Sequence, residues 1–309
     1  MPLSDELRHE LAAIAPERRC DRLAEISALF HSAGSVHLRG RGALAVHLDV
    51  ASSAVARRAF SLLRDLEVRS EIRTYRRRAF DRATRYQLHV EGDEGSLDTL
   101  REAGVLDSRL RPLEYPPRRV VARACCRGAY LRGAMLGGGS LSGPRLPHLE
   151  LRTTSLDGAG FLASVARAHG IDGAKVVDRG RHAALYAKGS DAIEGLLLAA
   201  GADGIVLALE ERAVLAATRA HANRLANADH ANLVRTSRAA QEQLEALRVL
   251  QADGTLERLP DRLHEVARLR LRYPQLPLRE LAAKCEPPSS KASVHRRLRK
   301  LQDLASSQR

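Results

Sequence analysis

The stretch CCRGAYLRGAMLGGGSL, residues 125–141, repeats CDRLAEISALFHSAGSV, residues 20–36, without a gap. Gly139 therefore pairs with Gly34, and the segments that follow match in the same order: HLDV with HLEL, RYQLHVEG with HAALYAKG, and SLDTLREAGVL with DAIEGLLLAAG. A period of about a hundred residues is longer than that of a solenoid repeat. The sequence therefore predicts two copies of one small α+β domain.

Each copy is predicted to run helix, hairpin, helix, hairpin, helix. The alternation of HLDV and HLEL is typical of strands. The segments SAVARRAFSLLRDL and LDGAGFLASVARAHG have the spacing of amphipathic helices, and Ser155 is placed to cap the second of them.

Small residues recur at every fourth position of the first helix in each copy. Residues four apart share one helix face, and interior glycine costs up to about 1 kcal/mol relative to alanine unless close packing requires it. We therefore expect the two copies to pack helix to helix along this stripe, the repeat seam, formed by Ala24, Ala28 and Ser32 in the first copy and by Ala129, Gly133 and Gly137 in the second.

The three glycines that end the second of these helices are also compatible with a phosphate-binding loop. A dinucleotide fingerprint, however, follows a strand and opens a helix, whereas these glycines end a helix. Gly138 and Gly143 have the spacing of a Walker motif, but Pro144 and Arg145 stand where Lys and Ser or Thr are needed. A mononucleotide site and a small-molecule substrate are therefore not expected.

The composition favours a polyanionic partner. The net charge is +13, and the first Lys in the chain is Lys175, so the cations are nearly all Arg. A GC-rich genome accounts for Arg over Lys but not for the excess over acids. A chain this basic commonly binds nucleic acid, and Arg suits phosphates and guanine edges.

Neither a targeting segment nor a membrane span is expected. The N-terminus MPLSDELRHEL lacks the apolar region of a signal peptide. The best apolar run, GLLLAAGADGIVLALEE, is interrupted by Asp203 and ends in two glutamates. These features predict a cytoplasmic protein.

No metal or other cofactor is predicted from motif spacing. The cysteines Cys20, Cys125, Cys126 and Cys285 show neither C-x-x-C spacing nor the density of a disulfide framework. The twelve histidines form no H-E-x-x-H pair. A structural or merely tolerated role is expected for the cysteines.

The C-terminal part of the chain predicts three short helices after a helical connector. The first is DRLHEVARLRLRY, the second is LRELAAKC, and the third, SKASVHRRLRKLQDL, follows a capping Ser289 or Ser290. This is the order of a helix-turn-helix domain whose last helix reads DNA.

The third helix separates apolar and basic residues. At 100° per residue, Val294, Leu298 and Leu301 share one side. No acid occurs from Ser289 to Leu301, although a solvated basic surface helix is the alternative. The residues expected to contact DNA are Ser290, Lys291, Ala292, Ser293, His295, Arg296, Arg297, Arg299 and Lys300.

The duplicated αββαββα unit resembles the LAGLIDADG homing-endonuclease fold, in which two motif helices form a seam and curved sheets make a saddle over DNA. In that family an acid just before the last Gly of each motif binds Mg²⁺. Ala33 and Gly138 occupy these positions here, so the resemblance implies a protein that is not an enzyme. Asp21, Glu25 and Asp49 are substitute acids only in principle, since each is expected to be solvated at the surface.

The whole chain resembles the WhiA family of sporulation and cell-division regulators. The stretches ANRLANADHANLVRTSRAAQEQL, LPDRLHEVARLRLRYPQLPLRELA and SKASVHRRLRKL carry this likeness, although Ser293 replaces a common Gly and Ala228 lies near a frequent Cys. The resemblance implies a nucleoid-associated transcription factor that binds promoter DNA, with a WhiB-like iron-sulfur regulator as a partner.

The fold class expected is α+β, a duplicated LAGLIDADG-like saddle followed by an all-α helix-turn-helix domain. An active nuclease, or a saddle that mainly binds protein, remains an alternative. The expected limits are 1–115 and 116–209 for the repeats, 210–258 for the connector and 259–309 for the helix-turn-helix domain.

Overall fold

The computed structural model describes residues 2–38, 44–76, 83–143 and 146–307. It forms two compact units, residues 1–216 and residues 217–309. Pro144 and Arg145, which argued against a Walker motif, lie outside the described residues.

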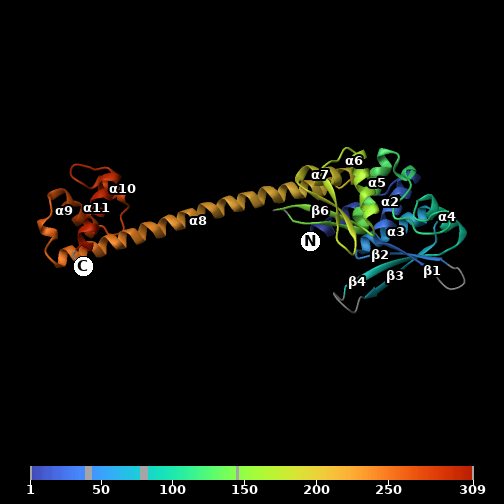
Figure 1. The fold of residues 1–309 in the computed structure, drawn as a ribbon, viewed down its shortest axis with the longest axis horizontal. Helices are drawn as coiled ribbons and strands as arrows, with labels where there is room; N and C mark the ends of the chain where they lie inside the picture. Colours follow the sequence, from blue (N-terminus) through green and yellow to red (C-terminus); the bar gives the residue numbers. More distant parts are fainter. Residues whose placement is uncertain (1, 39–43, 77–82, 144–145, 308–309) are drawn as a thin grey trace. The chain divides into compact units, whose positions relative to one another are not determined.

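The first unit contains the predicted duplication (Figure 1). A helix absent from the prediction, α1 (Leu3–Ala13), precedes it. The first repeat consists of α2 (Arg19–Ala33), β1 (Gly34–Leu38), β2 (Leu44–Val50), α3 (Ser53–Asp65), β3 (Ser70–Arg76), β4 (Thr84–Val90) and α4 (Glu94–Glu102). After the short 3-10 helix η2 (Arg118–Val121), the second repeat consists of α5 (Ala124–Gly138), β5 (Gly139–Leu141), β6 (His148–Thr153), α6 (Leu156–Ala168), β7 (Ala174–Asp178), β8 (Ala183–Lys188) and α7 (Ser190–Ala200).

The two sheets have the same topology. Their strand orders are β1-β2-β4-β3 and β5-β6-β8-β7, and every pair is antiparallel. Gly34 and Gly139 each begin the first strand directly after the first helix. A Cβ at Gly34 would lie 2.5 Å from the Phe30 carbonyl oxygen, and one at Gly139 would meet that of Met135. The turn from helix to strand therefore requires glycine in both copies.

One face of each sheet packs against the helices and the other is polar. In β2, Val46, Leu48 and Val50 are buried, whereas His47 and Asp49 between them are partly exposed. Helices α2 and α3 pack on the covered side of the first sheet, and α5 and α6 pack on that of the second (Figure 1). A single hydrophobic core joins both repeats, and Ser155 caps α6 as predicted by accepting a hydrogen bond from the Gly158 N–H.

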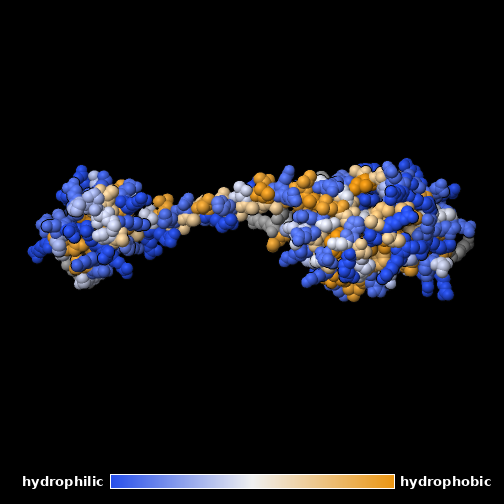
Figure 2. Space-filling view, turned by 90° about the horizontal axis from the view of Figure 1, so that it is seen from above, coloured by the Kyte–Doolittle hydropathy of each residue, from blue (hydrophilic) through white to orange (hydrophobic). Residues whose placement is uncertain are grey.

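The long helix α8 (Asp203–Ala252) continues from the first unit into the second. It begins within the segment assigned to the second repeat, whereas the expected connector starts at residue 210. The limits of the four segments given by the sequence stay a prediction. Hydrophobic residues interrupt the hydrophilic surface along this helix (Figure 2), and Leu225 and Leu233 are among the exposed hydrophobic residues there. Within the described part of the chain, no helix combines the length and apolarity needed to cross a membrane.

The second unit has the predicted helix order. After η3 (Leu256–Arg258) come α9 (Asp261–Arg272), α10 (Leu278–Ala283) and α11 (Lys291–Ser306). Their core includes Val266 of α9, Leu281 of α10 and Leu298 of α11, together with Leu247 and Leu250 from the end of α8. The end of α8 is thus part of this unit's core.

Candidate nucleic-acid interface

Helix α11 is fixed to its unit by a cap and an apolar face. Ser290 is the cap, and its Oγ accepts a hydrogen bond of 3.2 Å from the Ser293 N–H. Val294, Leu298 and Leu301 are at most 1% exposed, as the helical spacing predicted. The opposite face of α11 is therefore held toward solvent.

The solvent face of α11 is strongly basic. Ser293 and Arg297 lie at its half-buried edges, and within residues 217–307 none of the α11 cations forms an ion pair with an acid. The exposed residues of the expected set are Ser290, Lys291, Ala292, His295, Arg296, Arg299 and Lys300. Such a face suits the phosphates and base edges of a major groove.

Arg270 of α9 supports the turn that leads to α10, a role that the sequence pattern did not reveal. Its side chain is 2% exposed, and Nη1 donates hydrogen bonds to the carbonyl oxygens of Pro274, at 3.3 Å, and Leu276, at 2.7 Å. Burial lowers the pKa of this guanidinium. The only signal in the sequence was that Arg270 falls at helical spacing from Leu263 and Val266, on the buried face of α9. The carbonyl groups that it binds are brought near by tertiary structure.

Helices α2 and α5 pack closely along the stripe of small residues. A Cβ at Gly133 would collide with the Glu25 carbonyl oxygen and lie 2.9 Å from the Ala28 Cβ. A Cβ at Gly137 would lie 3.0 Å from the Ser32 Cβ. Ala24 and Ala129 are also buried on these helices. All six predicted seam residues therefore lie on the two helices that pack against each other.

The two positions at which the resembled homing endonucleases carry a metal-binding acid have no carboxylate in this chain. Ala33 is the last residue of α2 and Gly138 the last of α5. A Cβ at Gly138 would lie 2.6 Å from the Arg152 carbonyl oxygen of β6. The backbone of β6 therefore occupies the space that the first atoms of an acidic side chain at this position would need.

Glu25 contradicts the expectation of a solvated acid. It is fully buried, and its carboxylate accepts hydrogen bonds from Arg58 of α3, at 2.9 Å, and Arg132 of α5, at 2.8 Å. The prediction was wrong because both arginines that compensate the charge lie far away in sequence. Glu25 links three helices and is therefore not a metal ligand at the saddle.

Asp49 and Asp21 also have partners. Asp49 lies on the polar face of the first sheet and accepts hydrogen bonds from the Tyr75 hydroxyl, at 2.9 Å, and from Gln87. Asp21 is half-buried and lies beside the Cys20 thiol, 3.6 Å from its sulfur.

The polar faces of the two sheets carry mixed charge. The first presents Asp49 and the Arg73–Glu71 pair, and on the second sheet Glu150 forms ion pairs with Arg152, at 3.5 Å, and Arg179, at 3.2 Å. These surfaces are less suited to a polyanion than the solvent face of α11, where no acid among residues 217–307 forms an ion pair with the cations.

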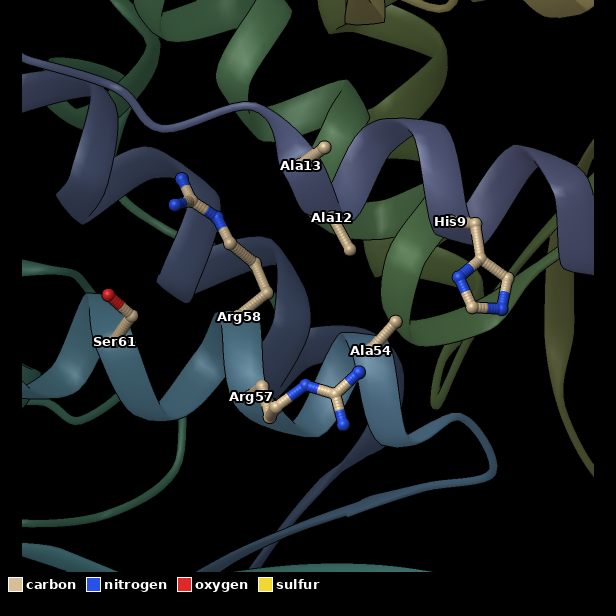
Figure 3. Close-up of a pocket in the computed structure, with 7 residues that line it drawn as sticks. All are labelled: His9, Ala12, Ala13, Ala54, Arg57, Arg58 and Ser61. Atoms are coloured by element: carbon tan, nitrogen blue, oxygen red, sulfur yellow. The ribbon is translucent and has the colours of Figure 1, made fainter.

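A shallow pocket of about 370 Å³ lies between α1 and α3 (Figure 3). Arg58 forms part of its wall and also reaches Glu25. The described lining has no carboxylate or cysteine and consists of His9, Ala12, Ala13, Ala54, Arg57, Arg58 and Ser61. It therefore provides neither a metal-binding carboxylate nor a thiol nucleophile.

The structure brings Cys20 together with Cys125 and Cys126, although Cys20 is 105 positions away from Cys125 in the sequence. Sγ of Cys20, Cys125 and Cys126 and a carboxylate oxygen of Asp21 all lie within 4.8 Å of one another. Burial raises the pKa of the Cys126 thiol. Motif spacing did not reveal this cluster because its members come from two different repeats. Cys285 lies in the core of the second unit.

A duplicated LAGLIDADG-like unit and a C-terminal helix-turn-helix domain define the class of protein. The comparisons agree over nearly the whole chain. The model "WhiA N-terminal LAGLIDADG-like domain" matches residues 19–106, "WhiA LAGLIDADG-like domain" matches 127–219, and "WhiA C-terminal HTH domain" matches 222–305. The chain belongs to the WhiA family.

Relatives of similar length support this assignment. The chain is 36% identical to "Probable cell division protein WhiA" of Symbiobacterium thermophilum, covering 99% of this chain and 98% of that protein. It is 37% identical to the protein of the same name from Heliobacterium modesticaldum, with 99% and 96% covered. The fold matches the crystal structure of full-length DUF199/WhiA from Thermatoga maritima at a TM-score of 0.58, with 21% identity and 99% of each chain covered.

Proposed function

We propose that this protein is a sequence-specific DNA-binding transcriptional regulator that reads promoter DNA with α11. The observation that carries the proposal is the solvent face of α11, where Arg296, Arg299 and their basic neighbours have no acidic partner within the described second unit. Arginines on such a helix donate to guanine edges, and flanking lysines neutralise phosphates. Nucleoid association follows from this binding.

We propose that the LAGLIDADG-like unit does not cut DNA. Ala33 and Gly138 supply no ligand for a divalent ion, and a metal ion at a scissile phosphate needs anionic oxygen ligands. The unit instead makes auxiliary contacts with DNA or with protein. Incubation of the full chain with promoter DNA and Mg²⁺ tests this proposal, because specific cutting that EDTA abolishes would contradict it.

The saddle is also a candidate for a mainly protein-binding surface. Its sheet faces carry Asp49, Glu71 and Glu150 among their basic residues, and such mixed charge favours a protein over a polyanion. The family resemblance implies a WhiB-like iron-sulfur regulator as the partner and sporulation or cell division as the process. Crosslinking in cells followed by identification of bound proteins tests the partner.

The DNA-binding role is tested by comparing the full chain with a chain that ends at residue 254. Both are titrated onto promoter fragments enriched by chromatin precipitation, at several salt concentrations. The full chain is expected to prefer these fragments over scrambled DNA, and the shortened chain to lose that preference. Equal affinity and selectivity of the two chains would show that specificity does not come from the helix-turn-helix domain.

A further inference from the structure

Four potential ligand side chains meet at the N-terminal ends of the two seam helices. Cys20 and Asp21 are the second and third residues of α2, and Cys125 and Cys126 are the second and third residues of α5. In the ungapped repeat pairing, Cys20 corresponds to Cys125 and Asp21 to Cys126. The packing of α2 against α5 therefore brings two equivalent pairs of side chains together across the seam.

The distances suit a single small cation. The sulfur atoms of Cys125 and Cys126 are 3.9 Å apart, and all four ligand atoms lie within 4.8 Å of one another. In a tetrahedral site with zinc-sulfur bonds of about 2.3 Å, neighbouring sulfurs are about 3.8 Å apart. The cluster is thus nearly the size of a tetrahedral zinc site before any ion is bound.

Positive charge lies beside part of the cluster. Nη1 of Arg18 lies 3.8 Å from the Cys125 sulfur, and both helix N-termini present positive partial charge to the cluster. Cys126 is 3% exposed, while Cys20, Asp21 and Cys125 are half-buried. The cluster therefore has a buried side and a side through which an ion can enter from solvent.

We propose that Cys20, Asp21, Cys125 and Cys126 form a zinc site that joins the two repeats. Thiolates select zinc over magnesium or calcium, and four protein ligands leave no open position for a substrate. The site lies at the opposite ends of α2 and α5 from Ala33 and Gly138. Its role is structural, because the ion crosslinks the two repeats. Cys20 and Cys125, for example, are 105 positions apart in the sequence.

Zinc content of the full chain tests the site directly. The protein is purified without chelators and under reducing conditions, and zinc is measured by elemental mass spectrometry. We expect about one zinc ion per chain, and a fall below roughly a tenth of that in Cys20→Ser and Cys125→Ser. Cys285→Ser is the matched control, because Cys285 is a buried cysteine of the other unit and its zinc content should equal that of the wild type.

Cobalt substitution distinguishes coordination from adventitious binding. Reduced, zinc-free protein titrated with Co²⁺ should show thiolate-to-cobalt charge transfer and the intense visible bands of a tetrahedral ion, saturating at equimolar metal. Asp21→Asn should retain these bands but bind Co²⁺ more weakly, since one anionic ligand is removed. Zinc added to the metal-free chain should raise the melting temperature of the first unit by roughly 5 °C at a hundredfold excess over the dissociation constant.

Three results would overturn the proposal. The first is less than a tenth of an equivalent of zinc together with no cobalt charge-transfer band in reduced protein whose far-ultraviolet circular dichroism shows it to be folded. The second is equal loss of zinc in Cys285→Ser and Cys20→Ser. The third is a disulfide between Cys20 and Cys125, found by alkylation and mass spectrometry in protein taken directly from cells, which would indicate a redox pair instead.

Discussion

Glu25 of α2 and Arg132 of α5 form a buried ion pair across the seam, with 2.8 Å between Glu25 Oε2 and Arg132 Nε. The same carboxylate accepts hydrogen bonds from Arg58 of α3 at both oxygens, at 2.9 Å to Oε1 and 3.4 Å to Oε2. One acid thus compensates two buried guanidinium groups, and each repeat supplies at least one member of the network.

Replacement of Glu25 by Gln is expected to destabilise the first unit strongly. Both arginines would stay buried without a counter-charge, and breaking a buried pair from one side costs about 3 to 5 kcal/mol. Urea titration followed by circular dichroism measures the change in the free energy of unfolding. Glu242→Gln is the control: its partner Arg238 is exposed on α8, so a loss of less than about 1 kcal/mol is expected. Similar losses for the two variants would contradict the account of the seam.

Gly133→Ala is expected to destabilise the chain, although alanine is the better helix former. The added Cβ collides with the backbone of α2 at Glu25, and such overpacking costs about 1 to 3 kcal/mol. Gly160→Ala in α6 is the matched control, because no atom lies within 4 Å of its Cβ position, and it should stabilise by roughly 0.5 to 1 kcal/mol. Thermal unfolding of both variants measures this difference, and stabilisation by both would show that α2 and α5 are not in close contact.

His31 is expected to make stability fall in mild acid. It is 5% exposed on α2, and burial lowers its pKa from 6.5 to about 4. The unfolded chain therefore binds a proton at a higher pH than the folded chain, so stability present above pH 6.5 is lost as the pH falls toward 4. The loss amounts to about 3 kcal/mol.

The pH dependence is measured by urea titration of the wild type and His31→Leu between about pH 7 and pH 4. The variant should show a shallower loss of stability than the wild type over this interval. His221→Gln, on the exposed surface of α8, serves as the control and should retain the wild-type slope. Equal slopes for the wild type and His31→Leu would contradict a buried neutral histidine.

The duplication and the helix-turn-helix order could be predicted because both depend on local pattern. The ungapped match of Gly34 with Gly139 reflects a steric requirement at the helix-to-strand turn that both copies share. The spacing of Val294, Leu298 and Leu301 likewise predicted the buried face of one helix, and the structure confirms that these three side chains are buried.

Features that depend on long-range packing could not be predicted from the same patterns. The burial of Glu25 requires Arg132, which is 107 positions away, and the cysteine cluster requires the N-termini of α2 and α5 to meet. Helix α1 has buried Leu3, Leu7 and Leu11, whose helical spacing was a usable signal, but it has no counterpart in the repeat comparison. Arg270 satisfies carbonyl groups of a turn whose geometry only the packed helices define.

The most direct test of DNA reading by α11 is the ratio of dissociation constants for promoter and scrambled DNA, measured for the wild type and for Arg296→Ala/Arg299→Ala over a range of salt. Removal of each arginine that hydrogen-bonds a base should cost roughly 1 to 3 kcal/mol, so the ratio should fall at least about tenfold. Arg235→Ala/Arg238→Ala removes the same charge from α8 and should leave the ratio unchanged. An unchanged ratio in Arg296→Ala/Arg299→Ala, or an equal fall in both double variants, would contradict the assignment of sequence recognition to α11.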